Sequence, residues 1–132
     1  MKSAQLAYSI LCDDVRLEIG NKLSLMGIFE NVYLPSFPAM VLRFAVINHW
    51  IGAGDYQTQV RVISPEGHEV TASAQSMFRI EPEGYADNVT FFANVAFERA
   101  GRYSIQSYLD GKVVFERPLF VGMIQQPPTT VN

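Results

Sequence analysis

The sequence predicts an all-β protein built as an antiparallel two-sheet sandwich of about seven to eight strands. Apolar and polar residues alternate with a period of two along most of the chain, which is typical of strands with one buried face. Turn-forming residues separate these runs at intervals of about 8–11 residues, as in sandwich domains. The only interval with helical spacing is 13–19, where Asp13 is placed to cap a short helix and Val15 and Ile19 are four residues apart.

The first quarter of the chain contains two predicted strands and a connector. An opening strand is expected over Leu6–Cys12, and a second over Leu23–Leu34, broken or bulged near Gly27. Gly20-Asn21 is a turn pair just before the second strand. The segment 35–38 contains two prolines, which exclude regular structure, so it is expected to be a connector.

The middle of the chain predicts a buried strand followed by a hairpin. Met40–Trp50 is a long apolar run whose two faces both look buried, and Gly52-Ala53-Gly54 is expected to end it in a turn. Residues 55–63 and 68–80 both alternate strictly. Ser64-Pro65-Glu66-Gly67 lies between them with the proline and glycine positions of a type I turn, so these two runs are expected to pair.

The last third of the chain predicts a further strand and a second hairpin. Asn88–Glu98 is the strand, and Arg102–Leu109 begins the hairpin. Asp110-Gly111 is a strong signal for a tight turn in which both residues have positive φ. The return strand continues to Val121, and Pro118 makes it an edge or a bulged strand there, because proline donates no backbone hydrogen bond.

Length and composition predict one domain over residues 1–124 and a flexible tail over 125–132. With 132 residues, 48% hydrophobic and 17% charged, the chain has enough apolar surface for a core without disulfide or metal support. Its net charge is −3 and its 10 basic residues are scattered, which argues against nucleic-acid binding. The one cysteine, Cys12, forms no internal disulfide, and no segment reads as a signal peptide or a membrane span. A cytoplasmic location is therefore expected.

Few residues suggest catalysis or metal binding. Asp13, Asp14 and Glu18 form the densest acidic group, and the sequence favours a helix cap with solvated charges while leaving a bound cation open. His49 and His68 are the only histidines, too few with one cysteine for a zinc site and without a nucleophile motif beside them.

The remaining motifs are read as structural. Cys12 is expected to be a buried, inert thiol, because neighbouring carboxylates raise a thiol pKa. Gly52-Ala53-Gly54 lacks the helix and lysine of a phosphate-binding loop. No cofactor is expected.

Surplus apolar residues predict an interface. A two-layer sandwich buries one face of each sheet, yet three predicted strands carry apolar residues on both faces. The candidate interface residues on the second faces are Phe92, Tyr108, Val114, Val41 and Ile47. A homo-oligomer is the simplest partner, and docking of another protein is the other.

The segment from Phe97 to Gln106, followed by Asp110-Gly111-Lys112, resembles the last two strands of immunoglobulin-like sandwiches. In those domains a Gly-x-Tyr step opens the strand and the tyrosine ties down a corner, and here the step is Gly101 to Tyr103. The resemblance covers the last third of the chain and implies an immunoglobulin-like architecture.

The opening of the chain is similar to an uncharacterised bacterial domain-of-unknown-function family. The similarity lies in Cys12–Arg16 and Gly20–Phe29. It implies a bacterial source and carries over no activity.

Three functional classes follow from the sequence. The first is a non-enzymatic protein-binding or self-assembly module. The second is a small-ligand-binding domain that uses loops at one end of the sandwich, near Trp50 and Tyr56 or near Tyr85. The third, less favoured, is a hydrolase with a dispersed site that uses a carboxylate or a histidine.

Overall fold

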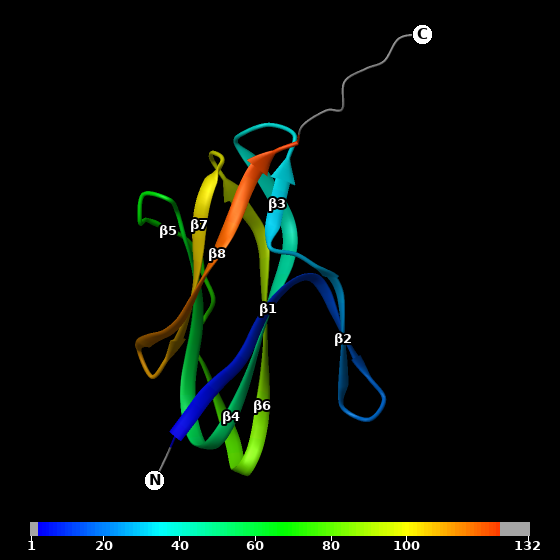
Figure 1. The fold of residues 1–132 in the computed structure, drawn as a ribbon, viewed down its shortest axis with the longest axis vertical. Coiled ribbons are helices and arrows are strands. Elements are labelled where there is room, and N and C mark those ends of the chain that lie inside the picture. The colour runs from blue at the N-terminus through cyan, green and yellow to red at the C-terminus, as the bar shows by residue number, and fades with distance from the viewer. Residues whose placement is uncertain (1–2, 125–132) are drawn as a thin grey trace.

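The computed structural model describes residues 3–124, and the predicted tail at 125–132 lies outside the described residues. It confirms the all-β prediction, since the described part of the chain forms eight strands (Figure 1). They are β1 (Ser3–Glu18), β2 (Lys22–Ile28), β3 (Asn31–Leu34), β4 (Ala39–Ile63), β5 (Glu69–Ala72), β6 (Ser76–Phe97), β7 (Gly101–Leu109) and β8 (Lys112–Met123). Residues 3–124 contain no helix long and apolar enough to cross a membrane.

The strands form one hydrogen-bonded sheet of mixed direction. Its order is β2-β1-β4-β7-β8-β3, and β5 and β6 both pair with β4. All pairs are antiparallel except β3 with β8, where Asn31 to Leu34 run parallel to Phe120 to Met123. The wholly antiparallel prediction is therefore wrong for this pair. Alternation along a strand shows which face is buried but not the direction of the neighbouring strand.

Strand β4 belongs to two parts of the sheet. Its first half pairs with β1 and with the second half of β6, and its second half pairs with β7, β5 and the start of β6. The two halves join at a register shift between Gly52 and Gly54, where φ is 136° and 119°. The predicted turn at 52–54 is therefore wrong, because the strand continues through it. A Cβ at Gly52 would lie 2.2 Å from the backbone oxygen of Ser3, so glycine is required there by the close approach of β1.

The main core draws on both halves of β4. Phe44 and Val46 from the first half share one cluster with Val60 and Val62 from the second, and all four side chains are buried. The cluster also includes side chains of β1, β6, β7 and β8, namely Leu11, Phe92, Val95, Phe97, Tyr103, Ile105, Leu119 and Val121.

A second cluster explains why both faces of β4 are buried from Phe44 on, as predicted, although Met40 and Leu42 earlier in the run are exposed. Ala45 and Ile47 project from the other face of β4 and pack with Cys12. Partly buried side chains of the β1–β2 hairpin, including Leu23 and Leu25, cover this cluster. In Figure 1 the hairpin projects to one side of the long strands. Apolar residues on the second face of β4 are thus covered by the chain itself.

The interval 13–19, the only one with helical spacing and too short to stand alone as a helix, forms no helix, because its residues continue β1 into that hairpin. Asp14 pairs with Met26 and Glu18 with Lys22. The turn between the strands is the predicted Gly20-Asn21 pair, with φ of 89° and 58°. A helix of this length would have had to stand without a packed face, whereas the strand gains cross-strand partners.

The two predicted hairpins are confirmed. At the first turn the Gly67 N–H donates to the Ser64 oxygen at 2.9 Å, and β5 pairs with the end of β4. The return run is interrupted at 73–75, where Ser73 exchanges hydrogen bonds with Val60 instead of continuing the ladder. At the second turn Asp110 and Gly111 have φ of 49° and 81°, as a tight hairpin turn requires.

Other element predictions hold in part. The run 23–34 is broken after Gly27 into β2 and β3. The predicted strand Asn88–Glu98 is the second half of the long β6. At Pro118 strand β8 pairs only with β7, since its pairing with β3 begins at Phe120, so the predicted edge position is confirmed.

Candidate functional site

The five predicted interface residues do not share one surface. Ile47 and Phe92 are 1% and 3% exposed, so neither is available outside the chain, and Val41 packs partly buried against the main core. Tyr108 is half-buried under the Arg61 guanidinium, 4.6 Å from the ring centroid. Only Val114 is exposed, at 46%. The interface stays a prediction, but these residues do not define it.

The exposed face of β1, β4 and β6 carries a row of stacked rings. His49 lies between Tyr8 and Tyr85, with ring centroids 4.6 Å and 5.2 Å away. The Asp87 Oδ1 lies 2.6 Å from the His49 Nδ1. Partial burial and the nearby Asp87 carboxylate raise the pKa of Tyr8. The row joins three strands, because Tyr8 and Asp87 are the cross-strand partners of His49 on either side.

This His–Asp pair has the geometry of an oriented imidazole. A serine or cysteine hydrolase triad would add a nucleophile in hydrogen-bond reach of the second ring nitrogen. Within residues 3–124 no serine, threonine or cysteine hydrogen-bonds to His49. The pair is best read as a clamp across the sheet.

A cleft, which we call the hairpin cleft, opens between the β1–β2 hairpin and β6. It has a volume of about 350 Å³ and its apolar walls are formed by Leu17, Leu23, Tyr85 and Val89, with Asp87 between them. Leu17 is 72% exposed and Tyr85 is 59% exposed. No residue of β4 lines this cleft, so it lies against β6 and the hairpin alone.

Strand β6 also has the longest unpaired edge in the described part of the chain. Its residues from Gly84 to Phe97 pair only with β4. Between Tyr85 and Ala93 the only charged residue is Asp87. At Asn94 φ is 53°, and beyond it the buried positions shift to Val95 and Phe97, so the regular edge ends there.

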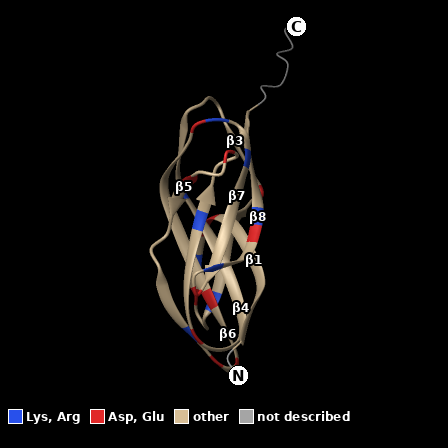
Figure 2. Ribbon diagram, turned by 90° about the vertical axis from the view of Figure 1, so that its left-hand side faces the viewer, with Lys and Arg blue, Asp and Glu red and all other residues tan. Residues whose placement is uncertain are grey.

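The other edges are short or protected. Strands β2, β3 and β5 have seven, four and four residues. The free part of β1 is interrupted by a register shift between Leu6 and Tyr8. The free part of β8 carries charges and a proline, at Lys112, Glu116, Arg117 and Pro118. Figure 2 shows how sparsely charged residues occur along the strands.

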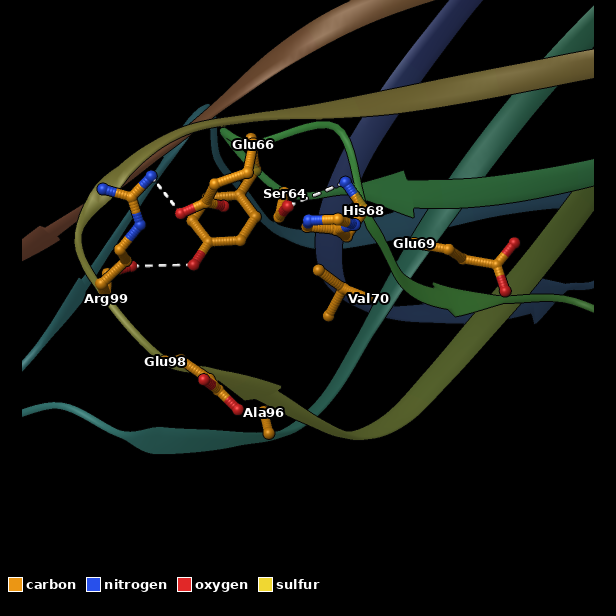
Figure 3. Close-up of a pocket in the computed structure, with 9 residues that line it drawn as sticks. Ser64, Glu66, His68, Glu69, Val70, Ala96, Glu98 and Arg99 are labelled. Atoms are coloured by element: carbon orange, nitrogen blue, oxygen red, sulfur yellow. Dashed lines mark hydrogen bonds and ion pairs between the residues drawn. The ribbon is translucent and has the colours of Figure 1, made fainter.

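A second cleft, which we call the end cleft, lies at the end of the molecule formed by the β4–β5 turn and the β6–β7 connection (Figure 3). Its volume is about 570 Å³. Glu66 and Arg99 form an ion pair on one side, and the Tyr103 hydroxyl donates to the Arg99 backbone oxygen at 2.8 Å. A backbone N–H at Glu66 itself, then Ser64 and Arg99, lower the pKa of Glu66. Burial raises the pKa of Tyr103.

The end cleft is acidic. Besides the paired Glu66 it is lined by Glu69, whose carboxylate lies 3.5 Å from Arg61, and by Glu98, which has no ion-pair partner in residues 3–124. Val70 and Ala96 add apolar surface. The arrangement suits a positively charged group with an apolar stem.

Ser64 and His68 also line the end cleft. The Ser64 hydroxyl accepts a hydrogen bond from the backbone N–H of His68 at 3.0 Å, and its own hydrogen bond to the Glu66 carboxylate is one cause of the lowered pKa of that group. Across residues 3–124, no three His, Cys, Asp or Glu side chains lie close enough together to hold a metal ion.

The acidic group at the start of the chain is dispersed by the strand. Asp14 forms an ion pair with Arg43 at 2.8 Å and accepts the Val15 N–H at 2.9 Å. Asp13 lies against Gly27, where a Cβ would be 2.2 Å from its carboxylate oxygen. Cys12 is buried, as predicted, and burial is the main cause of its raised pKa, with Asp13 and Asp14 adding to it.

The predicted ligand loop near Trp50 and Tyr56 is not a surface. Trp50 is fully buried and donates to Asn88 at 2.6 Å, and Tyr56 is 5% exposed. Tyr85, the alternative position, does line the hairpin cleft. Sequence reasoning missed Leu17 as its partner because that residue lies in the interval with helical spacing, where no strand was expected.

Comparisons with known proteins identify a family and a fold. A family model described as a family of unknown function (DUF6941) matches residues 7–122. No curated protein matches the chain. Two solved structures similar to it are a β-glucosidase from Listeria innocua in complex with isofagomine and the C-terminal domain of wzt. Their TM-scores are 0.57 and 0.53 at 9% and 7% identity, covering 92% and 96% of this chain and 16% and 77% of those chains.

A third similar structure is the Pseudomonas fluorescens alkylpurine DNA glycosylase AlkC bound to DNA containing an abasic site analog. It has a TM-score of 0.52 at 8% identity, over 70% of this chain and 28% of that one. The chain thus spans about a quarter of the glycosylase and less than a fifth of the glucosidase. At these identities the likeness concerns the fold alone.

Proposed function

The chain belongs to DUF6941, a family of unknown function, and we propose that its role is non-enzymatic self-assembly through the free edge of β6. A second copy of the chain adds its own β6 to this edge and extends the sheet. Strand addition of this kind gains affinity from backbone hydrogen bonds and specificity from side-chain pockets beside the edge.

The unprotected edge carries the proposal. Soluble proteins blunt long strand edges with charges, prolines, bulges or a covering element, because unpaired backbone groups attract other strands. The free stretch of β8 has such devices, whereas Tyr85–Ala93 has a single charge. An edge left open in this way is expected where it has a partner.

The side chains beside the edge suit an identical partner. Phe91 is 49% exposed on the outer face of β6, and the Arg43 guanidinium lies 5.5 Å from its ring. Asp87 is held by His49 of the same copy. Two copies can therefore meet in an antiparallel, two-fold arrangement that brings apolar rings together without placing like charges opposite one another.

Replacing Phe91 tests the proposal. We expect the wild-type chain to form dimers in light scattering at micromolar concentrations, and Phe91→Glu to weaken self-association by about tenfold or more, because it buries a charge at the edge. The nearby Arg43 favours the new carboxylate in the monomer, so the variant should still fold.

Phe120→Glu is the matched control. Phe120 is 47% exposed and lies 5.9 Å from the Arg102 guanidinium, but it is on β8. This variant should self-associate like the wild type. A wild-type chain that stays monomeric at high micromolar concentration, or an equal effect of both variants, would contradict the proposal.

A second candidate function is binding of a small cationic ligand in the end cleft, supported by the unpaired Glu98. A probe is 1,5-pentanediamine, with 1,5-pentanediol as the uncharged control. We expect weak binding of the diamine alone in an NMR titration, reduced about two- to fivefold by Glu98→Gln, as for an exposed ion pair. Glu83→Gln, outside this cleft, should have no effect, and equal shifts with the diol would refute the idea.

The finer fold and location predictions are part of the proposal. Support for an immunoglobulin-like two-layer sandwich comes from the core shared by the two halves of β4 and from the Tyr103 hydroxyl, which bonds back to Arg99 as a tyrosine corner does. The buried single thiol of Cys12 supports a cytoplasmic location. An experimental structure, and fractionation of cells that contain the protein, would test these points.

A further inference from the structure

The hairpin cleft and the exposed Phe91 are complementary features of one strand, and from them we infer the register of the dimer. Two copies pair antiparallel along β6 about a two-fold axis at Val89, and Phe91 of each copy enters the hairpin cleft of the other. This inference rests on the proposed self-association and adds the residues that position it.

The cleft has the size and lining for an aromatic side chain. Its volume of about 350 Å³ is bounded by Leu17 and Leu23 of the hairpin and by Tyr85 and Val89 of β6. Leu17 is 72% exposed although it stands beside other apolar side chains. An apolar group placed in the cleft would remove this surface from water.

The side chain that fills the cleft comes from a strand added to the free edge of β6. The cleft is lined by β6 and the hairpin and by no residue of β4. A strand added to β6 projects every second side chain toward the same face as Tyr85 and Val89. On a second β6 the exposed apolar side chain of this face that lies outside the cleft is Phe91.

The position of the cleft selects the register. Its β6 residues are Tyr85, Ala86, Asp87 and Val89, so its centre lies at Asp87. A two-fold axis at Val89 places Phe91 of one copy directly opposite Asp87 of the other. Axes at Asn88 or Thr90 would place Phe91 opposite Tyr85 or Val89, at the two ends of the cleft rather than its centre. An axis at Phe91 would place Phe91 opposite itself, outside the cleft, and an axis at Asp87 would oppose two carboxylates, which is destabilising.

The charges agree with this register. The Asp87 carboxylate is 2.6 Å from His49 Nδ1 and 24% exposed. The edge of an aromatic ring carries partial positive charge, so Phe91 approaching edge-on is compatible with the carboxylate. The Arg43 guanidinium beside Phe91 is paired with Asp14, so it brings no unpaired charge to the contact.

Cysteine cross-linking tests the register. In Val89→Cys the two new thiols would lie opposite each other, about 4.5–5.5 Å apart at Cβ, within reach of a short bis-maleimide. In Ala93→Cys they would be about 27 Å apart, because each lies four residues from the axis. We expect a covalent dimer for the first variant only. Wild-type chain, whose Cys12 is buried, is the background control.

Two hairpin variants test the cleft. Leu17→Ala should weaken dimerisation by about tenfold, because Leu17 contacts the inserted ring. Ile19→Ala, on the same hairpin, 99% exposed and outside the cleft, should leave it unchanged. Both substitutions are at exposed sites, so thermal melting should show an intact fold.

The outcomes separate the inference from the proposed function. A dimer that is sensitive to Phe91→Glu but cross-links at position 93 and ignores Leu17→Ala would overturn the register while self-association through β6 stands. A monomeric wild type would overturn both. Cross-linking at position 89 together with the Leu17 effect would support the arrangement.

Discussion

The Tyr103 hydroxyl holds one wall of the end cleft in place, and a local sequence motif predicts it. Tyr103 is 2% exposed, and its hydroxyl donates to the Arg99 backbone oxygen at 2.8 Å. This contact fixes the β6–β7 connection that carries Glu98 and Arg99 into the cleft. The Gly101–Tyr103 step was sufficient to predict a tied corner, because the spacing of the motif is local.

Removing this hydroxyl should loosen the corner. Tyr103→Phe is expected to lower the free energy of unfolding by about 1 kcal/mol, the usual contribution of one hydrogen bond, measured by urea denaturation. Tyr108→Phe is the control, since its hydroxyl bonds only to the Gln106 side chain at 2.8 Å. Tyr108→Phe should lower the free energy of unfolding by less than half as much. An equal loss in the two variants would show that the corner has no special role.

At the same scale, residue chemistry could be predicted where it depends on neighbours in sequence. The burial of Cys12 and the positive φ at Asp110 and Gly111 follow from their local context. The positions of Ile47 and Phe92 could not be predicted in this way. Whether an apolar side chain is exposed depends on which distant segment covers it, and one sequence does not show that.

Among the elements, the strands and tight turns were predictable and the continuity of the strands was not. Alternation and turn residues locate both hairpins. The interval 13–19 offered helical spacing, but its cross-strand partners in β2 prevailed. Gly52 and Gly54 were expected to form a turn, yet they form a register shift within β4, and both interpretations require the same residue type.

Gly52 and Gly111 should respond differently to substitution. Gly111→Ala should cost about 1–2 kcal/mol from left-handed backbone strain alone, since no atom lies within 4 Å of its Cβ position. Gly52→Ala adds a collision with the Ser3 backbone oxygen and should destabilise the fold clearly more. Thermal or urea unfolding of both variants measures the difference, and similar losses would mean that β1 shifts freely away from β4.

For the whole molecule, the all-β prediction is confirmed. The interface stays a prediction, and the structure leaves only Val114 of its five candidate residues exposed. Part of the surplus apolar surface is covered by the chain's own β1–β2 hairpin, which packs on Ala45 and Ile47. Exposed apolar side chains remain on several strands, among them Leu42 of β4, Phe91 of β6 and Phe120 of β8. Two others, Leu17 and Tyr85, line the cleft beside β6. That cleft joins segments more than sixty residues apart in sequence, so no local pattern indicates it.

Strand β4 has a consequence for how the protein comes apart. It pairs with β1, β5, β6 and β7, and its side chains reach all three hydrophobic clusters, including the one around Trp50 and Tyr56. Releasing either half of this strand removes backbone partners from the other parts of the sheet. We therefore expect the amide hydrogens of the buried residues in both halves of β4 to exchange with solvent mainly through global unfolding, and a protease to release neither half as a separate piece.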